Sequence, residues 1–209
     1  MSKFVLIDGH SILNRAFYGV PIFTNSEGLH TNAVFGFLNI MFKIIDSKQP
    51  DYMAVAFDVH QPTFRHEMFK DYKGTRKPMM EELREQVPVI KELLQKMNIT
   101  TVELPGYEAD DVIGTLSKKG EKAGMEVDVI SGDRDLLQLA SDHITICIPK
   151  TKKGQTTVEE YNTEGVRKLY KVTPTEFIDV KALMGDSSDN IPGVPGIGEK
   201  GATAIISQF

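Results

Sequence analysis

The sequence predicts an α/β fold in which helices cover both faces of a mainly parallel central sheet, followed by a helical appendage. Over the first two-thirds of the 209-residue chain, short apolar runs that end at polar residues or glycine alternate with longer stretches of helical spacing. Strands that alternate with helices in this way form parallel sheets, because each helix carries the chain back to the start of the next strand. The last third instead holds helix signals and a stretch rich in glycine and proline.

Hydrophobic periodicity places the individual elements. A short continuous apolar run favours a buried strand, whereas apolar residues three or four positions apart favour a helix. In the stretch 80–97, Pro88 interrupts the helical pattern and predicts a kink. The predicted strands are 4–7, 52–57, 101–104 and 127–130, and the predicted helices are 34–45, 80–97 and one that begins near residue 109.

The appendage is expected to begin near residue 171, which divides the chain into a core of residues 1–170 and a helical part of residues 171–209. Residues 156–161 look like the last extended segment of the core. Thr173 can then cap a helix, Pro174 suits its first position, and Glu176 can bond back to the cap.

Composition narrows the class of protein. An apolar share of 41% and a charged share of 25% are typical of a soluble globular domain. No apolar stretch is long enough for a membrane span, and the first residues do not resemble a signal peptide. The single cysteine, Cys147, lies in an apolar run and is expected to be a core residue, so a reducing, cytoplasmic setting fits.

Carboxylates follow the predicted strands at the ends where ligands bind. Asp8 follows the first strand, Asp58 the second, Glu108 the third, and Asp133 and Asp135 the fourth. The carboxyl ends of parallel strands meet at one edge of a sheet, where open α/β folds bind their ligands. A single aspartate at a strand end is a common turn residue, but acids at four ends indicate a shared site.

The strongest local signal is Glu108-Ala109-Asp110-Asp111 at a predicted helix start. A helix N-terminus accommodates one or two acids, whereas three crowded carboxylates repel one another unless a cation lies between them. Asp186 and Asp189 form a further pair, which on its own could be a solvated turn. Oxygen ligands favour Mg²⁺ or Mn²⁺, and two such ions about 4 Å apart suit phosphodiester hydrolysis.

A basic segment, residues 59–80, lies between the second strand and the next helix. Within it, Arg65 to Lys77 interleaves basic residues with Phe69 and Tyr72. Such a run can be a solvated surface or a contact for nucleic acid. The net charge of −5 argues against a nucleic-acid partner, but without the nine carboxylates proposed for metal the balance is +4.

Six motifs, taken in order, resemble those of the 5′-nuclease (flap endonuclease) family, and most closely its bacterial members that precede polymerase domains. They span nearly the whole chain, and the ordered set is far more specific than any one motif. The motifs are Leu6-Ile7-Asp8-Gly9, Ala56-Phe57-Asp58, Tyr72-Lys73-Gly74-Thr75-Arg76, Glu108-Ala109-Asp110-Asp111, Ser131-Gly132-Asp133-Arg134-Asp135, and Gly185-Asp186-Ser187-Ser188-Asp189-Asn190-Ile191-Pro192-Gly193.

The resemblance implies a PIN-like core, a helix-hairpin-helix appendage and a role for each site residue. Lys73 and Arg76 would contact the scissile phosphate as catalytic residues. The other implied DNA contacts are Arg65, Lys70, Tyr72, Lys77 and the hairpin glycines Gly193, Gly196 and Gly198, where a K⁺ ion often binds. One metal ion would be surrounded by Asp8, Asp58, Glu108, Asp110, Asp111 and Asp133, and the second by Asp135, Asp186 and Asp189, with Asp133 near both.

The implied activity is 5′-3′ exonuclease and structure-specific 5′-flap endonuclease cleavage in primer removal and repair. Expected partners are DNA with 5′ flaps, nicks or free 5′ ends and RNA primers, bound by a monomer in the bacterial nucleoid, with polymerase domains in the parent protein. The family domain continues past the hairpin, whereas this chain stops at Phe209. A fragment is therefore expected, frayed after about residue 195 and weak in duplex binding.

Two other functions stay open. A shorter PIN-like ribonuclease would share the sheet and a smaller acidic set, but it lacks the basic segment and the hairpin. A DNA-structure-binding module without turnover would keep both. A phosphatase with an aspartyl nucleophile needs a second acid two residues after the first, and His10 stands at that position after Asp8.

Overall fold

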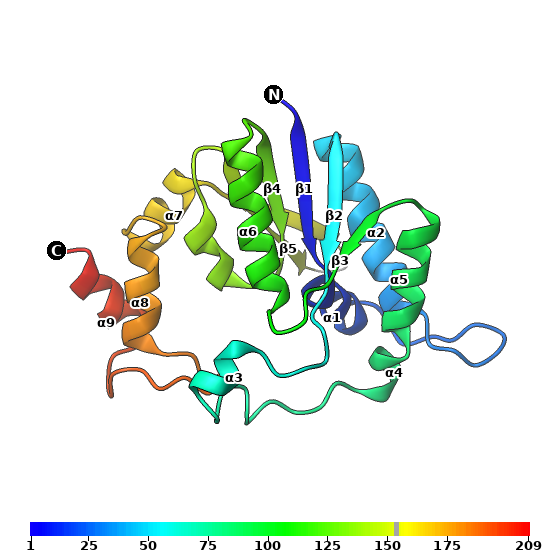
Figure 1. The fold of residues 1–209 in the computed structure, drawn as a ribbon, viewed down its shortest axis with the longest axis horizontal. Helices are drawn as coiled ribbons and strands as arrows, with labels where there is room; N and C mark the ends of the chain where they lie inside the picture. Colours follow the sequence, from blue (N-terminus) through cyan, green and yellow to red (C-terminus); the bar gives the residue numbers. More distant parts are fainter. Residues whose placement is uncertain (153–154) are drawn as a thin grey trace.

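The computed structural model describes residues 1–152 and 155–209, and its centre is a six-stranded sheet (Figure 1). The strand order is β3-β2-β1-β4-β5-β6, and each pair from β3 to β5 is parallel. The predicted mainly parallel sheet is therefore confirmed. The strands are β1 (Lys3–Asp8), β2 (Tyr52–Ala56), β3 (Thr100–Val102), β4 (Glu126–Ile130), β5 (Ile144–Lys152) and β6 (Gln155–Tyr161).

One parallel strand, β5, is absent from the sequence prediction. Its apolar start, Ile144 to Ile148, includes Cys147, which is fully buried as expected. β5 pairs in parallel with β4 and then turns back as the antiparallel strand β6. The extended segment predicted at 156–161 is part of β6.

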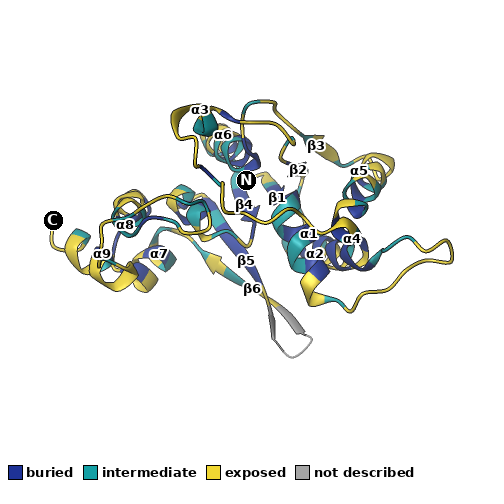
Figure 2. Ribbon diagram, turned by 90° about the horizontal axis from the view of Figure 1, so that it is seen from below, coloured by how far each residue is buried: buried dark blue, intermediate teal, exposed yellow. Residues whose placement is uncertain are grey.

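Two groups of helices cover the two faces of the sheet, because successive strand residues point to opposite faces. On one face, Val5 and Ile7 of β1 pack with α1 (Gly9–Gly19), α2 (Asn32–Lys48), α4 (Glu81–Arg84) and α5 (Gln86–Lys96). On the other face, Leu6 packs with α6 (Ala109–Lys122), η1 (Arg134–Leu139), α7 (Thr163–Tyr170) and α8 (Glu176–Met184). Figure 2 shows the buried residues concentrated on the sheet and the inward sides of these helices.

The helix predicted over 80–97 is broken into α4 and α5 one turn before Pro88. Proline has no N–H to donate to the carbonyl of Arg84, four residues earlier, and its ring crowds that carbonyl. The predicted kink at Pro88 is thus confirmed as a short break around Glu85.

The appendage begins with the predicted capping box. The Thr173 N–H donates to Glu176 Oε2 at 2.6 Å, and the Glu176 N–H donates to Thr173 Oγ1 at 3.2 Å. The last helix, α9 (Glu199–Ile206), packs on α8, and Ala202 is fully buried in the core on the α6 side of the sheet. Ala202 therefore packs on the described part of the chain, whereas Ile205 and Phe209 are exposed.

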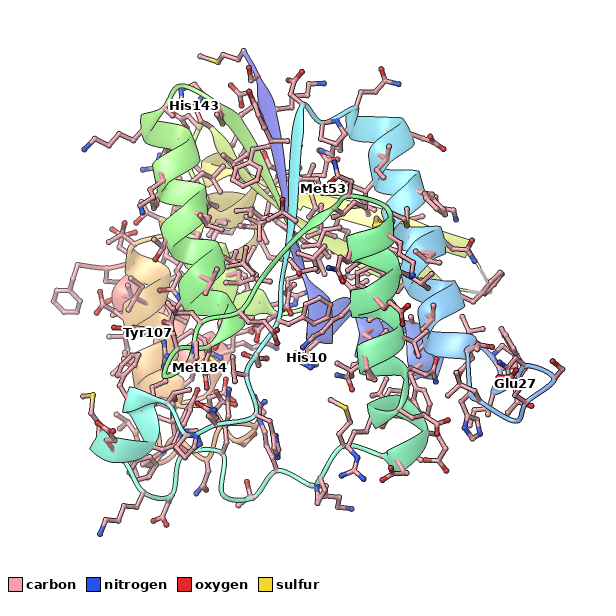
Figure 3. All side chains as sticks on the ribbon, turned by 45° about the vertical axis from the view of Figure 1, so that its right-hand side comes forward. His10, Glu27, Met53, Tyr107, His143 and Met184 are labelled. Carbon is pink, nitrogen blue, oxygen red and sulfur yellow. The ribbon has the colours of Figure 1, made fainter. Side chains whose placement is uncertain are left out.

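The carboxyl ends of β1, β2 and β4 meet at one edge of the sheet, at the bottom of Figure 1. The basic segment, with its short helix α3 (Phe64–Met68), crosses below this edge, and α8 and α9 lie to one side of it. His10 marks this edge and His143 the opposite one (Figure 3). Within the described ranges, no helix is long and apolar enough to cross a bilayer.

Candidate active site

All nine carboxylates that the sequence singled out line one cleft at this edge, with a volume of about 1110 Å³. The chain brings them together from the ends of β1, β2 and β4, the start of α6 and the loop after α8. Basic and phenolic side chains of the basic segment line the same cleft. The carboxylates are Asp8, Asp58, Glu108, Asp110, Asp111, Asp133, Asp135, Asp186 and Asp189, and the others are Arg65, Tyr72, Lys73 and Arg76.

Asp8 is the most buried of the site's aspartates. Its Oδ1 accepts from the Ser11 N–H at 3.0 Å and so caps α1, and its Oδ2 accepts from Ser131 Oγ at 2.7 Å. Burial raises the pKa of Asp8 to about 6, against the opposing effect of these hydrogen bonds and with help from the charges of Asp58 and Asp133. Burial thus makes the ionised form of Asp8 more costly, and a bound cation would offset that cost.

Asp110 lies in the first turn of α6 and faces the carboxylates of Asp8 and Asp133. Burial, followed by these two neighbouring charges, raises the pKa of Asp110 well above its usual value. Among the described residues, no donor bonds to this half-buried carboxylate. A bound cation is the partner that this oxygen cluster fits, because hard divalent cations prefer carboxylate ligands.

Asp58 is held by α6 and by His10. Its Oδ1 accepts from the Ala109 N–H at 2.7 Å, and His10 Nδ1 lies 3.4 Å from Oδ2. The same ring nitrogen lies 3.1 Å from the amide nitrogen of Asp58, so it either accepts that N–H or, when protonated, donates to the carboxylate. Burial acts to raise the pKa of Asp58, but the bonds from His10 and Ala109 outweigh it and the pKa is lowered.

The basic segment is tied across the cleft through two carboxylates. Lys73 Nζ lies 2.6 Å from Glu108 Oε1, and Arg76 pairs with Asp189. The buried Tyr72 hydroxyl lies 2.9 Å from Glu108 Oε2 and 3.0 Å from Asp189 Oδ2. A hydroxyl has one proton, so it cannot fully satisfy both carboxylates. Burial, together with the two carboxylate charges, raises the pKa of Tyr72.

Arg65 and Asp111 form a bidentate ion pair, in which Arg65 Nη1 lies 2.7 Å from Asp111 Oδ2 and Nη2 lies 2.8 Å from Oδ1. Asp111 also accepts from the Glu108 N–H at 2.9 Å and so closes the capping box of α6. Burial acts to raise the pKa of Asp111, but Arg65 outweighs it and the pKa is lowered. Asp111 is therefore anchored outward, unlike Asp110 beside it.

The far end of the cleft contains Asp135 and Asp186, bridged by Lys181 of α8. Lys181 Nζ lies 2.8 Å from Asp135 Oδ1 and 2.8 Å from Asp186 Oδ2. Burial raises the pKa of Asp135, with Lys181 opposing. Burial also acts to raise the pKa of Asp186, but the hydrogen bonds from Lys181 and Ser188 outweigh it and hold this pKa well below its usual range.

No ready-made group of three metal-ligating side chains exists within the described part of the chain. Most of the carboxylates are instead held by amides, hydroxyls and basic side chains, in the contacts just given. The donor set, all oxygen and crowded in one cleft, still fits hard divalent cations. Cations would have to draw the carboxylates together and exchange with their present partners.

The remaining sequence-predicted residues lie outside the cleft lining. Lys70 and Lys77 are exposed on the basic segment. The three hairpin glycines differ in what they require. A side chain on Gly193 would overlap the main chain of Met184, Gly196 has a φ of +81°, and Gly198 faces open space at the N-cap of α9. Packing explains why position 193 is a glycine, and backbone conformation explains position 196. Close approach to a phosphate can therefore explain the glycine only at position 198.

Sequence reasoning missed Ser131 and Lys181. Ser131 binds Asp8, and its hydroxyl also accepts from the Asp133 N–H at 3.0 Å, so it links two strand ends. Lys181 has one local signal, a basic residue in the last turn of a helix that leads into Asp186, but its pairing with Asp135 depends on the fold.

Comparison with known proteins places the whole chain in one family. A model described as the 5′-3′ exonuclease N-terminal resolvase-like domain matches residues 3–171, and one described as the 5′-3′ exonuclease C-terminal SAM fold matches residues 172–209. DNA polymerase I of Bacillus caldotenax is 54% identical over 207 residues, 99% of this chain and 23% of the relative. The chain thus spans about a quarter of the length of the curated relatives it matches.

Two solved structures of a phage enzyme resemble the chain over 99% of its length and 75% of theirs, each with 27% identity and a TM-score of 0.77. One is T5 5′-exonuclease with divalent zinc ions bound, and the other is bacteriophage T5 flap endonuclease in a pseudo-enzyme–product complex with DNA and metal ions. Together with the family model that covers residues 3–171, these likenesses show that the chain belongs to the 5′-3′ exonuclease family.

Proposed function

We propose that this chain is the nuclease part of a DNA polymerase I and hydrolyses DNA phosphodiesters as a 5′-3′ exonuclease and 5′-flap endonuclease. The observation that carries the proposal is the single cleft in which nine carboxylates and three cationic side chains of the basic segment face one another. Acidic residues for cations beside basic residues for phosphates are the two halves of a phosphodiesterase site.

Two Mg²⁺ or Mn²⁺ ions fit the two ends of the cleft. Asp8, Asp110 and Asp133, with Asp58 beside them, would hold one ion, and Asp135, Asp186 and Asp189 the other. Glu108 and Asp111 would contribute from the capping box of α6, directly or through water. When bound, divalent ions would lower the pKa of a water molecule so that it can attack phosphorus as hydroxide, and they would relieve charge on the leaving oxygen. The T5 relatives solved with metal ions support this assignment.

The chain's own contribution is to bind and orient the scissile phosphate. Lys73 and Arg76, which here pair with Glu108 and Asp189, would contact the phosphate between them, where negative charge grows in the transition state. Arg65 and Tyr72 line the same cleft and would bind adjacent phosphates. Lys70 and Lys77, exposed on the same segment, would bind the phosphates that approach the cleft.

The appendage, residues 171–209, would bind the duplex beside the cut, and residues 1–170 would contain the chemistry. The N-cap of α9 at Gly198 presents backbone N–H groups that would bind a phosphate, and carbonyl oxygens of the hairpin would hold a K⁺ ion. Gly193 and Gly196 would support this turn rather than touch the backbone of the DNA.

The physiological substrates would be 5′ flaps, nicks and free 5′ ends, including RNA primers, handled by a monomer in the bacterial cytoplasm at the nucleoid. The polymerase domains of the parent protein would supply the nicks and flaps. The relatives named DNA polymerase I and the T5 flap endonuclease solved with DNA support this assignment.

A titration with a labelled DNA flap tests the proposal. The chain is mixed with an end-labelled 5′-flap duplex, a 3′-flap duplex of the same sequence and single-stranded RNA, while Mg²⁺ or Mn²⁺ is varied. Cleavage of the 5′ flap alone, abolished by chelator, is expected. Preferential cutting of the RNA would favour a PIN-like ribonuclease, and binding without cutting at any cation concentration would favour a DNA-structure-binding module.

A further inference from the structure

Lys181 occupies the position between the two acids at the far end of the cleft. Its ammonium nitrogen lies 2.8 Å from an oxygen of Asp135 and 2.8 Å from an oxygen of Asp186, and its side chain is 23% exposed. Asp135 belongs to η1 of the core, whereas Asp186 follows α8. One lysine thus bridges two acids that come from separate parts of the chain and offsets one of their two negative charges.

The other group of carboxylates in the cleft is built differently. Asp8 is held by a hydroxyl and an amide, Asp133 accepts from the Asp135 N–H, and Asp110 has no donor within the described residues. In that part of the structure, none of these three carboxylates pairs with a lysine or arginine. The two ends therefore differ in how much negative charge remains for a divalent cation.

Lys181 also differs from the cations of the basic segment. Lys73 and Arg76 come from a loop that crosses the cleft, and half of the Arg76 side chain is exposed. Lys181 projects from a regular helix that packs against η1 and the core. Its position beside Asp135 and Asp186 is thus fixed by the packing of a helix.

We propose that Lys181 is a positioning residue that serves as a built-in counter-ion, so a divalent cation binds Asp135 and Asp186 only by displacing it, and more weakly than the cation bound at Asp8, Asp110 and Asp133. The inference rests on the proposed function, because it assumes that both ends of the cleft bind cations. Its physical basis is competition: the entering ion must break two short ion pairs in a partly buried site, where charges interact strongly.

The counter-ion has a second role in the absence of metal. Without Lys181, the carboxylates of Asp135 and Asp186 would face each other across the junction of the core and the appendage with no neutralising charge. Their repulsion would then destabilise the metal-free protein and be relieved by cation binding. A merely structural lysine would lower stability at all cation concentrations alike.

Mn²⁺ binding to the 209-residue chain, followed by electron paramagnetic resonance of the free ion, tests this idea. For Lys181→Met, we expect the weaker of two Mn²⁺ affinities to rise by about tenfold or more while the tighter one is unchanged. The matched control is Lys118→Met, because Lys118 lines the same cleft and loses the same charge but pairs with Glu121. Lys181→Arg keeps the charge and should retain the weak affinity.

The outcomes separate the two proposals. No Mn²⁺ binding by the unsubstituted chain would overturn the proposed function itself. If two Mn²⁺ ions bind and the weaker affinity rises equally in Lys181→Met and Lys118→Met, only the role of Lys181 is overturned. The same holds if the weaker affinity falls in Lys181→Met. Thermal melting supplies an independent readout: Lys181→Met should melt lower than the unsubstituted chain without metal and gain more from Mn²⁺. A metal-independent loss would contradict the inference.

Discussion

Arg65 binds Asp111 with both ends of its guanidinium group, at 2.7 and 2.8 Å, while the same carboxylate closes the N-terminus of α6. This pair anchors the start of the basic segment to the helix that carries Asp110 into the cleft. The position of the basic segment and the position of the carboxylates are thus linked through one side chain.

Replacement of Arg65 should loosen the basic segment without unfolding the sheet. Arg65→Met removes both bonds, and Arg65→Lys cannot restore the two-pronged geometry. Hydrogen exchange of residues 64–77 should increase in both variants, by an amount equivalent to about 1–2 kcal/mol of local stability. Lys70→Met is the control, because Lys70 is exposed on the same segment. If hydrogen exchange is equally fast in the variants at positions 65 and 70, the Arg65–Asp111 pair does not anchor the basic segment.

Asp110→Asn should stabilise the metal-free protein at neutral pH. The pKa of Asp110 is raised in the folded state, so ionisation opposes folding once the pH exceeds the ordinary value near 4. The gain in melting temperature, a few degrees at pH 7, should therefore shrink as the pH is lowered toward 4. Scanning calorimetry between pH 4 and 8 measures it, and a gain that is independent of pH would rule out charge as the cause.

Asp133→Asn should lower cleavage by several orders of magnitude with the fold intact. Asp133 faces Asp8 and Asp110, and the sheet does not need its charge for packing. Single-turnover cleavage of a 5′-flap duplex in saturating Mg²⁺ measures the loss. Asp142→Asn is a substitution of the same kind at an exposed residue next to His143, at the opposite edge of the sheet, and should cleave normally. Near-normal cleavage by Asp133→Asn would contradict the proposed cation site.

Lys73→Ala and Arg76→Ala should slow the chemical step more than they weaken DNA binding. Both side chains reach the carboxylates around which the phosphate would be cut, so their charges act most strongly as the transition state forms. Single-turnover rates and dissociation constants at one salt concentration separate the two effects. If only affinity falls, both residues are general phosphate contacts.

Gly193→Ala and Gly198→Ala should separate packing from DNA contact. A methyl group at position 193 overlaps the Met184 main chain, so this variant should lose about 1–3 kcal/mol of stability. At position 198 the methyl group meets open space, so the fold should persist while duplex binding weakens. Melting curves measure the stability of both variants, and duplex titrations measure their DNA affinity. Normal duplex binding by Gly198→Ala would show that the hairpin does not contact the DNA.

Local sequence patterns were enough to predict the sheet, the kink at Pro88 and the cap at Thr173, because each depends on neighbours within one turn or one strand. They also predicted that the nine acids share a cleft, since parallel strand ends converge. β5 was missed because an apolar run becomes a strand only through pairing with β4. Lys181 was missed for a similar reason, because Asp135 is far away in sequence.

The loop after α8 has a consequence for the synthesis of the protein. The amide N–H of Lys73 donates to the carbonyl oxygen of Asp189 at 2.9 Å, and the Tyr72 hydroxyl lies between Glu108 and Asp189. A nascent chain on the ribosome can complete its sheet long before Asp189 emerges, but its basic segment then lacks these attachments. The basic segment is therefore fixed across the cleft only after Asp189 has emerged and the loop after α8 has folded.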